Sequence, residues 1–232
     1  MELIFEGLRE AVARILTLDR DLLEAASASL VTSGSATSLS VVTGVPLGAA
    51  LGLGRFRGRG LLLALANTGM GLPPVAVGLF VAVFIWRSGP AGQLEWFCTR
   101  QAIITAQYLL AAPTIVGLTA VAVQSIDPMM RLQLTALGAT RLQSIALLMR
   151  ESRLLILTAV MAGFGAVISE IGASLMVGCN IKGDTRILTT AIALETSKGE
   201  FGAAFALAFV LLGIIFALNA LTTWAQQRAR PQ

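Results

Sequence analysis

The sequence predicts an all-α fold, a helical bundle that crosses a membrane several times. Apolar residues make up 56% of the 232 residues and charged residues only 13%, and the mean hydropathy is +0.80. A soluble domain carries about 25% charged residues. The alternation of apolar and polar residues that marks the strands of a membrane β-barrel is missing from the sequence. The membrane-spanning elements are therefore expected to be helices.

Five apolar stretches are long enough to span a bilayer, since a spanning helix needs about 20 residues. The predicted spans are 26–53, 60–86, 101–125, 154–178 and 201–225. The whole chain, 1–232, is interpreted as one transmembrane domain.

Two of the predicted spans carry signals about packing and shape. In the first, Gly44, Gly48 and Gly52 recur every four residues and so share one helix face, which can approach another helix closely. In the second, Pro73 and Pro74 remove two backbone donors and predict a break in the helix. That break either lines a pore or is purely structural.

Residues 1–20 are amphipathic and acidic, and they lack the basic start and small-residue cleavage site of a secretory signal. They are expected to form an amphipathic helix that lies on the outer face of the membrane that the chain spans. The alternative is a simple extension of the first span.

The distribution of arginines predicts the orientation. Three arginines fall in the short 54–60 loop, and short cytoplasmic loops are rich in Lys and Arg. With five spans, 54–60, 126–153 and the C-terminus lie in the cytoplasm and the N-terminus outside. This places nine of the 17 Lys and Arg residues inside: Arg55, Arg57, Arg59, Arg131, Arg141, Arg150, Arg153, Arg228 and Arg230.

Several chemistries are excluded by composition. The chain has no histidine and only two cysteines, so no metal site or cofactor is expected. It has no GxxxxGK[ST] motif and is not expected to hydrolyse ATP. The net charge of +4 is assigned to topology and not to nucleic-acid binding. Cys98 and Cys179 both lie near the expected outer face, as two separate buried thiols in the favoured interpretation or as a disulfide.

The stretch 126–153 is too polar to span the membrane and too apolar for a free linker. Asp127 and Pro128 form a good helix start, and Gly138 fits a helix end, where a left-handed conformation costs glycine little. Between them lie leucines at helical spacing. A short helix with these features is suited to dock into a groove of a partner, or else to rest on the membrane surface.

The stretch "ALGATRLQSIALLMRESRLLILTAV" resembles the cytoplasmic "EAA" loop of ABC importer permeases. Gly138 matches the glycine of that motif, whereas the E-A-A positions read Leu132-Gln133-Leu134 and the usual proline is Arg150. The resemblance implies that 126–153 is a coupling loop which binds a cytoplasmic ABC ATPase dimer. The residues assigned to this coupling are Leu132, Leu134, Ala136, Leu137, Gly138, Ala139 and Arg141.

A second stretch, "SEIGASLMVGCNIKGDTRILTTAIALETSKGEFGAAFALA", resembles permeases of oxyanion importers, and its "TRILTTAIALETSKG" is most similar to the tungstate branch. The resemblance implies a five-helix core of the type I, MetI-like kind. It also implies a homodimer in the cell inner membrane and an external protein that delivers the oxyanion. Molybdate and sulfate remain the alternative substrates.

Three groups of residues are assigned to substrate handling. Glu170 is the only carboxylate deep in a predicted span, and it is expected to bond to backbone amides near Gly172 and fix an outer gate. Thr185 and Arg186 are expected to guide an oxyanion in an outer loop, although Arg186 could instead pair with Asp184 or Glu195. The pore is expected to use the hydroxyls of the first span, namely Thr32, Ser33, Ser35 and Thr37.

Two other functional classes compete with transport driven by an ATPase. A membrane-embedded enzyme is disfavoured because the predicted spans contain no histidine and a single carboxylate. A passive channel or scaffold does not need a docking helix, so copurification with an ATPase distinguishes it.

Overall fold

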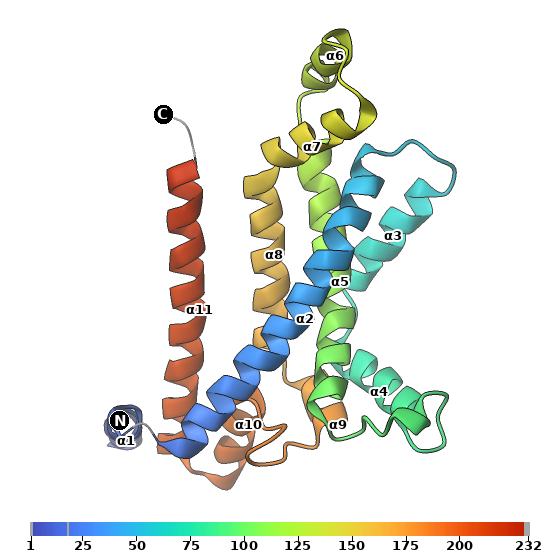
Figure 1. The fold of residues 1–232 in the computed structure, drawn as a ribbon. Helices are drawn as coiled ribbons and strands as arrows, with labels where there is room; N and C mark the ends of the chain where they lie inside the picture. The colour runs from blue at the N-terminus through green and yellow to red at the C-terminus, as the bar shows by residue number, and fades with distance from the viewer. Residues whose placement is uncertain (1, 18, 230–232) are drawn as a thin grey trace.

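In the computed structural model, which describes residues 2–17 and 19–229, most of the chain is helical (Figure 1). The elements in chain order are α1 (Glu2–Leu16), α2 (Arg20–Leu53), α3 (Arg59–Met70), α4 (Pro74–Ile85), the 3₁₀-helix η1 (Gly92–Leu94), α5 (Arg100–Gln124), α6 (Pro128–Ala136), α7 (Arg141–Glu151), α8 (Arg153–Ile168), α9 (Gly172–Gly178), α10 (Leu188–Lys198) and α11 (Phe201–Ala229). Arg230, counted above for topology, lies outside the described residues.

Three helices of the described chain, α2, α5 and α11, are individually long and apolar enough to cross a membrane. Two further pairs pass the same test together but are bent, α3 with α4 by 102° and α7 with α8 by 65°. The all-α membrane fold is thus confirmed. Length and composition allow up to five spans if each bent pair counts as one.

The second predicted span is broken where its prolines predict. Helix α3 ends at Met70 and α4 begins at Pro74, which occupies the first helical position, where a missing N–H costs nothing. Gly71 and the extended Pro73 make the turn between the two helices. The break is therefore encoded locally, by residues that do not continue a helix.

The fourth predicted span, 154–178, is wrong as a single helix. Helix α8 stops at Ile168, and a separate short helix, α9, begins at Gly172. The Glu170 side chain accepts hydrogen bonds from the first turn of α9, so it caps a new helix instead of continuing the old one. At its other end, α8 follows α7 directly but is bent against it by 65°.

Helices α2 and α5 form the centre of the bundle, where they run in the same general direction and cross at an angle (Figure 1). The glycine face of α2 makes this contact: a Cβ on Gly48 would lie 2.5 Å from the Val116 carbonyl oxygen, and one on Gly52 would lie 2.9 Å from that of Ala120. Because such distances leave no space for a side chain, glycine permits the close approach that its spacing predicted.

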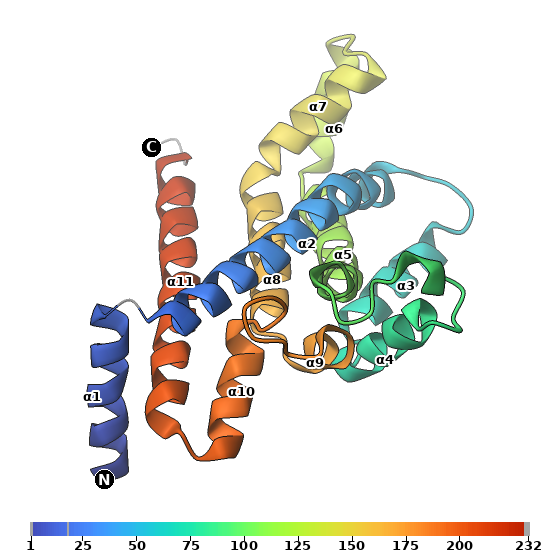
Figure 2. The same ribbon diagram turned by 60° about the horizontal axis from the view of Figure 1, so that its bottom comes forward.

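Helix α1 is a separate helix and not an extension of α2, because Asp19 caps α2 by accepting hydrogen bonds from the amides of Asp21 and Leu22. It packs against α11. Figure 1 shows α1 end-on beside one end of α11, and Figure 2 shows it alongside. Its exposed residues include Phe5 and Leu16, as expected of an amphipathic helix.

Different elements lie at the two ends of the bundle. Helices α6 and α7 project beyond the spans at one end, together with the loop between α2 and α3 (Figure 1). The loop between α4 and α5, helices α9 and α10, and helix α1 lie at the other end. These are called below the α6 end and the α10 end.

Candidate functional site

The docking helix predicted in 126–153 is α6. Its start is the predicted one: the Asp127 carboxylate accepts a hydrogen bond from the Met129 amide at 2.9 Å, and Pro128 is the first helical residue. Its end is also the predicted one, with Gly138 at φ +73°. The amide of Gly138 donates to Thr135 O and that of Ala139 to Leu134 O, each at 3.0 Å, which closes the helix end.

Helix α6 presents apolar side chains to its surroundings. Leu132 is 62% exposed and Leu137 83%, and all nine residues of α6 are at least partly exposed. Arg141 lies beyond the turn, at the start of α7, and is exposed too. The structure thus brings the predicted coupling residues together on α6, the turn that follows it and the start of α7, which project from the bundle (Figure 1). Projecting apolar side chains are what a docking helix needs.

Glu170 sits in the break between α8 and α9, and its side chain is 6% exposed. One carboxylate oxygen accepts from the amide of Ala173 at 2.6 Å. The other accepts from the amide of Ser174 at 3.0 Å and from its hydroxyl at 2.9 Å. Hydrogen bonding to amides near Gly172 is the contact expected from the sequence. A role for Glu170 in a gate stays a prediction.

Gly172 is required by the same break. A Cβ added there would lie 2.5 Å from Cγ2 of Val75, in the first turn of α4. Since the half-helices α4 and α9 pack against each other, both broken segments meet at this point. Gly172 is therefore a packing residue at the junction of the two breaks.

Buried polar side chains that the sequence analysis missed tie this break to its neighbours. The Thr189 hydroxyl donates to the Glu170 carbonyl at 2.8 Å, and the Ser29 hydroxyl accepts from the Leu188 amide at 2.7 Å. The Gln107 amide group, fully buried in α5, donates to Val167 O at 3.1 Å. A signal for Gln107 existed, because it is a large polar residue in the middle of an apolar span.

The hydroxyls of α2 assigned to the pore do not share one exposed face. Thr32, Ser33 and Thr37 are buried within the chain, and Thr32 donates to its own helix, to Ala28 O at 2.8 Å. Only Ser35 is partly exposed. Three of the four are therefore covered by the chain itself, since α2 packs against α5, α8 and α10.

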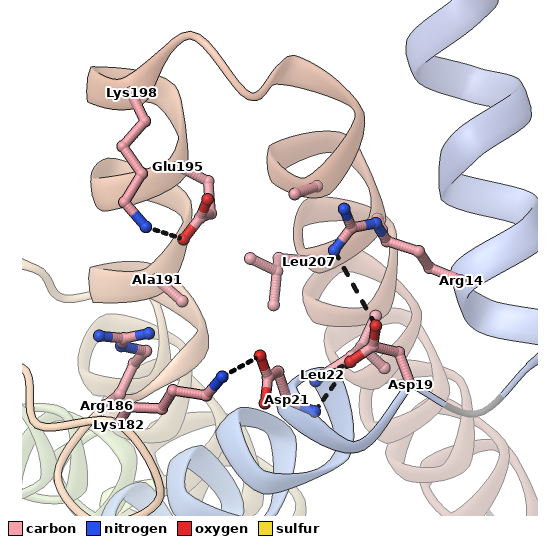
Figure 3. Close-up of a pocket in the computed structure, with 12 residues that line it drawn as sticks. Arg14, Asp19, Asp21, Leu22, Lys182, Arg186, Ala191, Glu195, Lys198 and Leu207 are labelled. Carbon is pink, nitrogen blue, oxygen red and sulfur yellow. Dashed lines mark hydrogen bonds and ion pairs between the residues drawn. The ribbon is translucent and has the colours of Figure 1, made fainter.

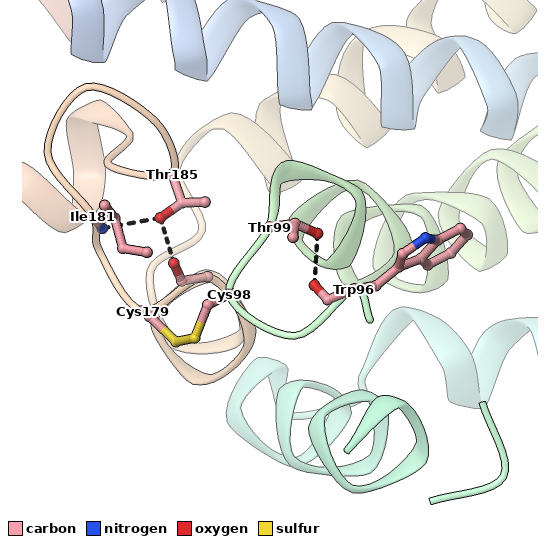
Figure 4. Close-up of a disulfide and its surroundings, with 7 residues drawn as sticks. Trp96, Cys98, Thr99, Cys179, Ile181 and Thr185 are labelled. Atoms are coloured by element: carbon pink, nitrogen blue, oxygen red, sulfur yellow. Dashed lines mark hydrogen bonds between the residues drawn. A yellow bond between two sulfur atoms is a disulfide. The ribbon is translucent and has the colours of Figure 1, made fainter. Parts of the chain in front are cut away.

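Cys98 and Cys179 form a disulfide, so the favoured expectation of two free thiols is wrong (Figure 4). Their Cα atoms are 5.1 Å apart. The bond joins the loop before α5 to the loop after α9, and the Cys98 amide also donates to Val177 O at 2.9 Å. Nothing in the sequence around either residue shows that the two loops meet.

Thr185 braces this loop and does not face solvent, with 1% of its surface exposed. Its hydroxyl donates to Gly178 O and accepts from the Ile181 amide (Figure 4). The only donor of this hydroxyl is thus used within the loop, and the guidance role expected of Thr185 stays a prediction.

Arg186 lines a pocket of about 400 Å³ at the α10 end (Figure 3). Its charged lining residues are Arg14, Asp19, Asp21, Lys182, Arg186, Glu195 and Lys198. Lys182 pairs with Asp21 at 2.5 Å and Lys198 with Glu195 at 2.9 Å. Asp184 pairs with Arg100 at 3.0 Å. Both carboxylates considered as alternative partners of Arg186 are thus engaged elsewhere.

The Arg186 side chain itself is only partly satisfied. One terminal nitrogen donates weakly to Asn180 O at 3.4 Å, and among the described residues its buried Nε has no hydrogen-bond partner. Arg186 therefore keeps donors for an additional ligand in a pocket whose other cations are paired with carboxylates.

Comparison with known proteins decides the family. Residues 44–231 match the family model of the binding-protein-dependent transport system inner membrane component. The chain belongs to this family. A tungstate uptake system permease protein, TupB, of Peptoclostridium acidaminophilum is 38% identical over 95% of this chain and 97% of its own length. A protein of Haloferax volcanii named "Probable anion ABC transporter permease protein" is 39% identical over 86% of this chain and 88% of its own length.

The fold of this inner membrane component matches that of a solved transporter. A chain in an inward-facing conformation of the MetNI methionine ABC transporter aligns with a TM-score of 0.78 over 93% of this chain and 99% of that chain. At 16% identity this likeness concerns the fold alone. The expected MetI-like fold is confirmed.

Proposed function

We propose that this inner membrane component is the permease subunit of an ATP-driven importer of tungstate. The observation that carries the proposal is the 38% identity, over nearly the full length of both chains, to a permease named for tungstate uptake. The sequence block 169–208 supports the same substrate. Molybdate or sulfate import is the alternative.

The proposed assembly is a homodimer of this chain with a cytoplasmic ABC ATPase dimer and an external oxyanion-binding protein. Family membership supports both partner proteins. Helix α6 and its C-cap support the position of the ATPase, because the exposed Leu132 and Leu137 need an apolar groove. The chain itself lacks a nucleotide-binding motif, so a separate subunit supplies ATP hydrolysis. Lipid surrounds the exposed apolar faces of the spans.

In the proposed orientation the α6 end lies in the cytoplasm and the α10 end outside. The arginines of the 54–60 loop support this, since short cytoplasmic loops are rich in arginine. The Cys98–Cys179 disulfide at the α10 end supports it independently, because disulfides persist in oxidising compartments. The N-terminus is then outside and the C-terminus inside.

Substrate entry is assigned to the α10 end. Arg186 guides the oxyanion there, because a guanidinium group matches a tetrahedral anion and the Nε of this one has no partner among the described residues. Glu170 does not bind the anion, because a carboxylate would repel it. Its role is to hold α9 against α8 and thereby to fix the outer end of the path.

Reconstitution tests the proposal. Proteoliposomes that contain this permease and its ATPase, with the binding protein outside, should accumulate tungstate only when ATP is supplied inside. Uptake without ATP would indicate a passive channel. Uptake of molybdate or sulfate, without uptake of tungstate, would show that the alternative substrate is the correct one.

A further inference from the structure

A second pocket with charged side chains lies at the α6 end, at the opposite end of the bundle from the pocket that Arg186 lines. It has a volume of about 580 Å³ and lies between the loop that follows α2 and the turn that joins α5 to α6. Arg55, Arg59 and Arg131 line it. The rest of the lining consists of backbone, apolar side chains and Gln124, without a carboxylate among the described residues.

The three arginines are not neutralised by ion pairs within the part of the chain that the structure describes. Arg59 donates from Nε to Leu51 O at 2.6 Å, and Arg131 donates from Nη2 to Val123 O at 3.1 Å. Arg55 is exposed and makes no such contact in the described chain. The buried Nε of Arg131 has no hydrogen-bond partner among the described residues.

Capping of helix ends explains only part of this arrangement. Arg59 and Arg131 each satisfy one carbonyl at the C-terminus of α2 or α5, which uses one of five N–H donors on each guanidinium. Each helix end contributes about half a negative charge, and Asp127 next to the pocket contributes one more. Against three guanidinium groups, about one positive charge and most of the donors remain uncompensated.

We infer that the pocket lined by Arg55, Arg59 and Arg131 binds a tetrahedral anionic group, a phosphate or an oxyanion of the same shape. Guanidinium groups match such anions with paired N–H donors. The pocket is open on one side, since Arg55 is exposed, so the group is held weakly. Pro128 and Leu132 of α6 also line the pocket, which places the bound anion beside the proposed docking helix.

Two sources can supply this chemistry. One is the phosphate of an anionic lipid headgroup, because the pocket lies where the spans α2 and α5 end. The other is a free oxyanion in solution on that side. The two sources are distinguished by whether binding depends on the lipid composition around the purified protein.

The test uses the full chain in nanodiscs of phosphatidylcholine alone or with phosphatidylglycerol. Binding of tungstate is measured by equilibrium dialysis, and retention of phosphatidylglycerol by native mass spectrometry. Arg55→Gln is the main variant, because Arg55 makes no contact that holds the fold. Arg131→Gln is the second. Arg57→Gln is the matched control, an exposed arginine of the same loop outside the pocket lining.

We expect Arg55→Gln and Arg131→Gln to weaken binding of tungstate or retention of phosphatidylglycerol by about three- to tenfold, as for a lost charge-assisted contact. Arg57→Gln should bind like the wild type. If these two variants lose tungstate binding in nanodiscs of phosphatidylcholine alone, the group bound in the pocket is a free oxyanion. If they lose only the retention of phosphatidylglycerol, it is a lipid headgroup.

Two results overturn the inference. In one, Arg57→Gln weakens binding as much as Arg55→Gln, which would show a diffuse positive surface in place of a site. In the other, the wild type retains neither probe. Because the test needs no ATPase, binding protein or uptake, its outcome is independent of the proposed transport function.

Discussion

Glu170 and Ser174 are joined by two hydrogen bonds, from the Ser174 amide at 3.0 Å and from its hydroxyl at 2.9 Å, both to the same carboxylate oxygen. The Ala173 amide donates to the other oxygen. These donors replace water around a carboxylate that is almost completely buried. The first turn of α9 thus supplies the hydrogen-bond donors that the buried Glu170 side chain needs, at the place where the fourth apolar stretch breaks.

Replacement of Glu170 separates a structural role from a direct one. Glu170→Leu leaves the amides of Ala173 and Ser174 without acceptors, at a cost of about 1–3 kcal/mol. Glu170→Gln keeps one acceptor and should be milder in both thermal stability and uptake. Glu200→Gln, the same substitution at an exposed position, is the matched control. A well-folded Glu170→Gln protein without transport would show that the charge itself takes part.

Gly138 is expected to control ATPase association through backbone conformation. Its φ of +73° favours glycine, while a Cβ at this position would meet nothing within 4 Å, so the effect is not steric crowding by neighbours. Gly138→Val should be strained by about 1–3 kcal/mol and disturb the end of α6. Gly138→Asn tolerates this conformation and is the control.

The measurement for Gly138 is copurification with the ATPase subunit, alongside membrane insertion. Gly138→Val should insert normally but retain less ATPase than Gly138→Asn. Equal retention by both variants would remove the assignment of this turn to docking.

The ends of helices such as α6 were predictable from the sequence because the residues that set them are neighbours in the chain. Asp127, Pro128 and Gly138 define both ends of α6 within a dozen residues. The break within the fourth stretch was not predictable in the same way, because apolar residues continue on both sides of Glu170. Its cause is a side chain that bonds forward to α9, and hydropathy does not register such a contact.

The site residues show the same limit. The contact of Glu170 follows from its chemistry, since a buried carboxylate needs donors nearby. Thr185, by contrast, is buried in the loop that begins at Cys179, and the disulfide ties this loop to Cys98, 81 residues away. A pairing over that distance comes from the packing of the helices, so a single sequence could only leave it open.

The disulfide predicts both a labelling result and a stability result. Protein purified without reductant should have no maleimide-reactive thiol, and reduction should expose two, because Cys98 and Cys179 are the only cysteines. Cys98→Ser should lower stability by about 2–4 kcal/mol, as typical disulfides do. Two reactive thiols in untreated protein would contradict the disulfide.

The orientation can be tested with the native cysteines in place, because disulfide-bonded sulfurs do not react with maleimides. Reporter cysteines are introduced singly, as Arg57→Cys and Lys198→Cys, at exposed positions at opposite ends of the bundle. An impermeant maleimide added to intact cells should label Lys198→Cys only. Labelling of Arg57→Cys instead would invert the proposed topology.

The last prediction concerns how tungstate crosses without a strong site in the membrane. A dianion is costly to place in an apolar medium unless donors surround it, and the central parts of the five predicted spans contain no Lys or Arg. Three of the four α2 hydroxyls expected to help are buried within one chain. In the proposed pathway the anion is therefore expected to rely on water, backbone and a weak contact at Arg186, and weak contacts also favour release. Isothermal titration of the purified permease with tungstate should show no nanomolar binding, whereas reconstituted uptake should prefer tungstate over sulfate. Nanomolar binding to the permease alone would demonstrate an intramembrane site that this pathway does not contain, and equal uptake of sulfate would refute the tungstate assignment while the permease function stood.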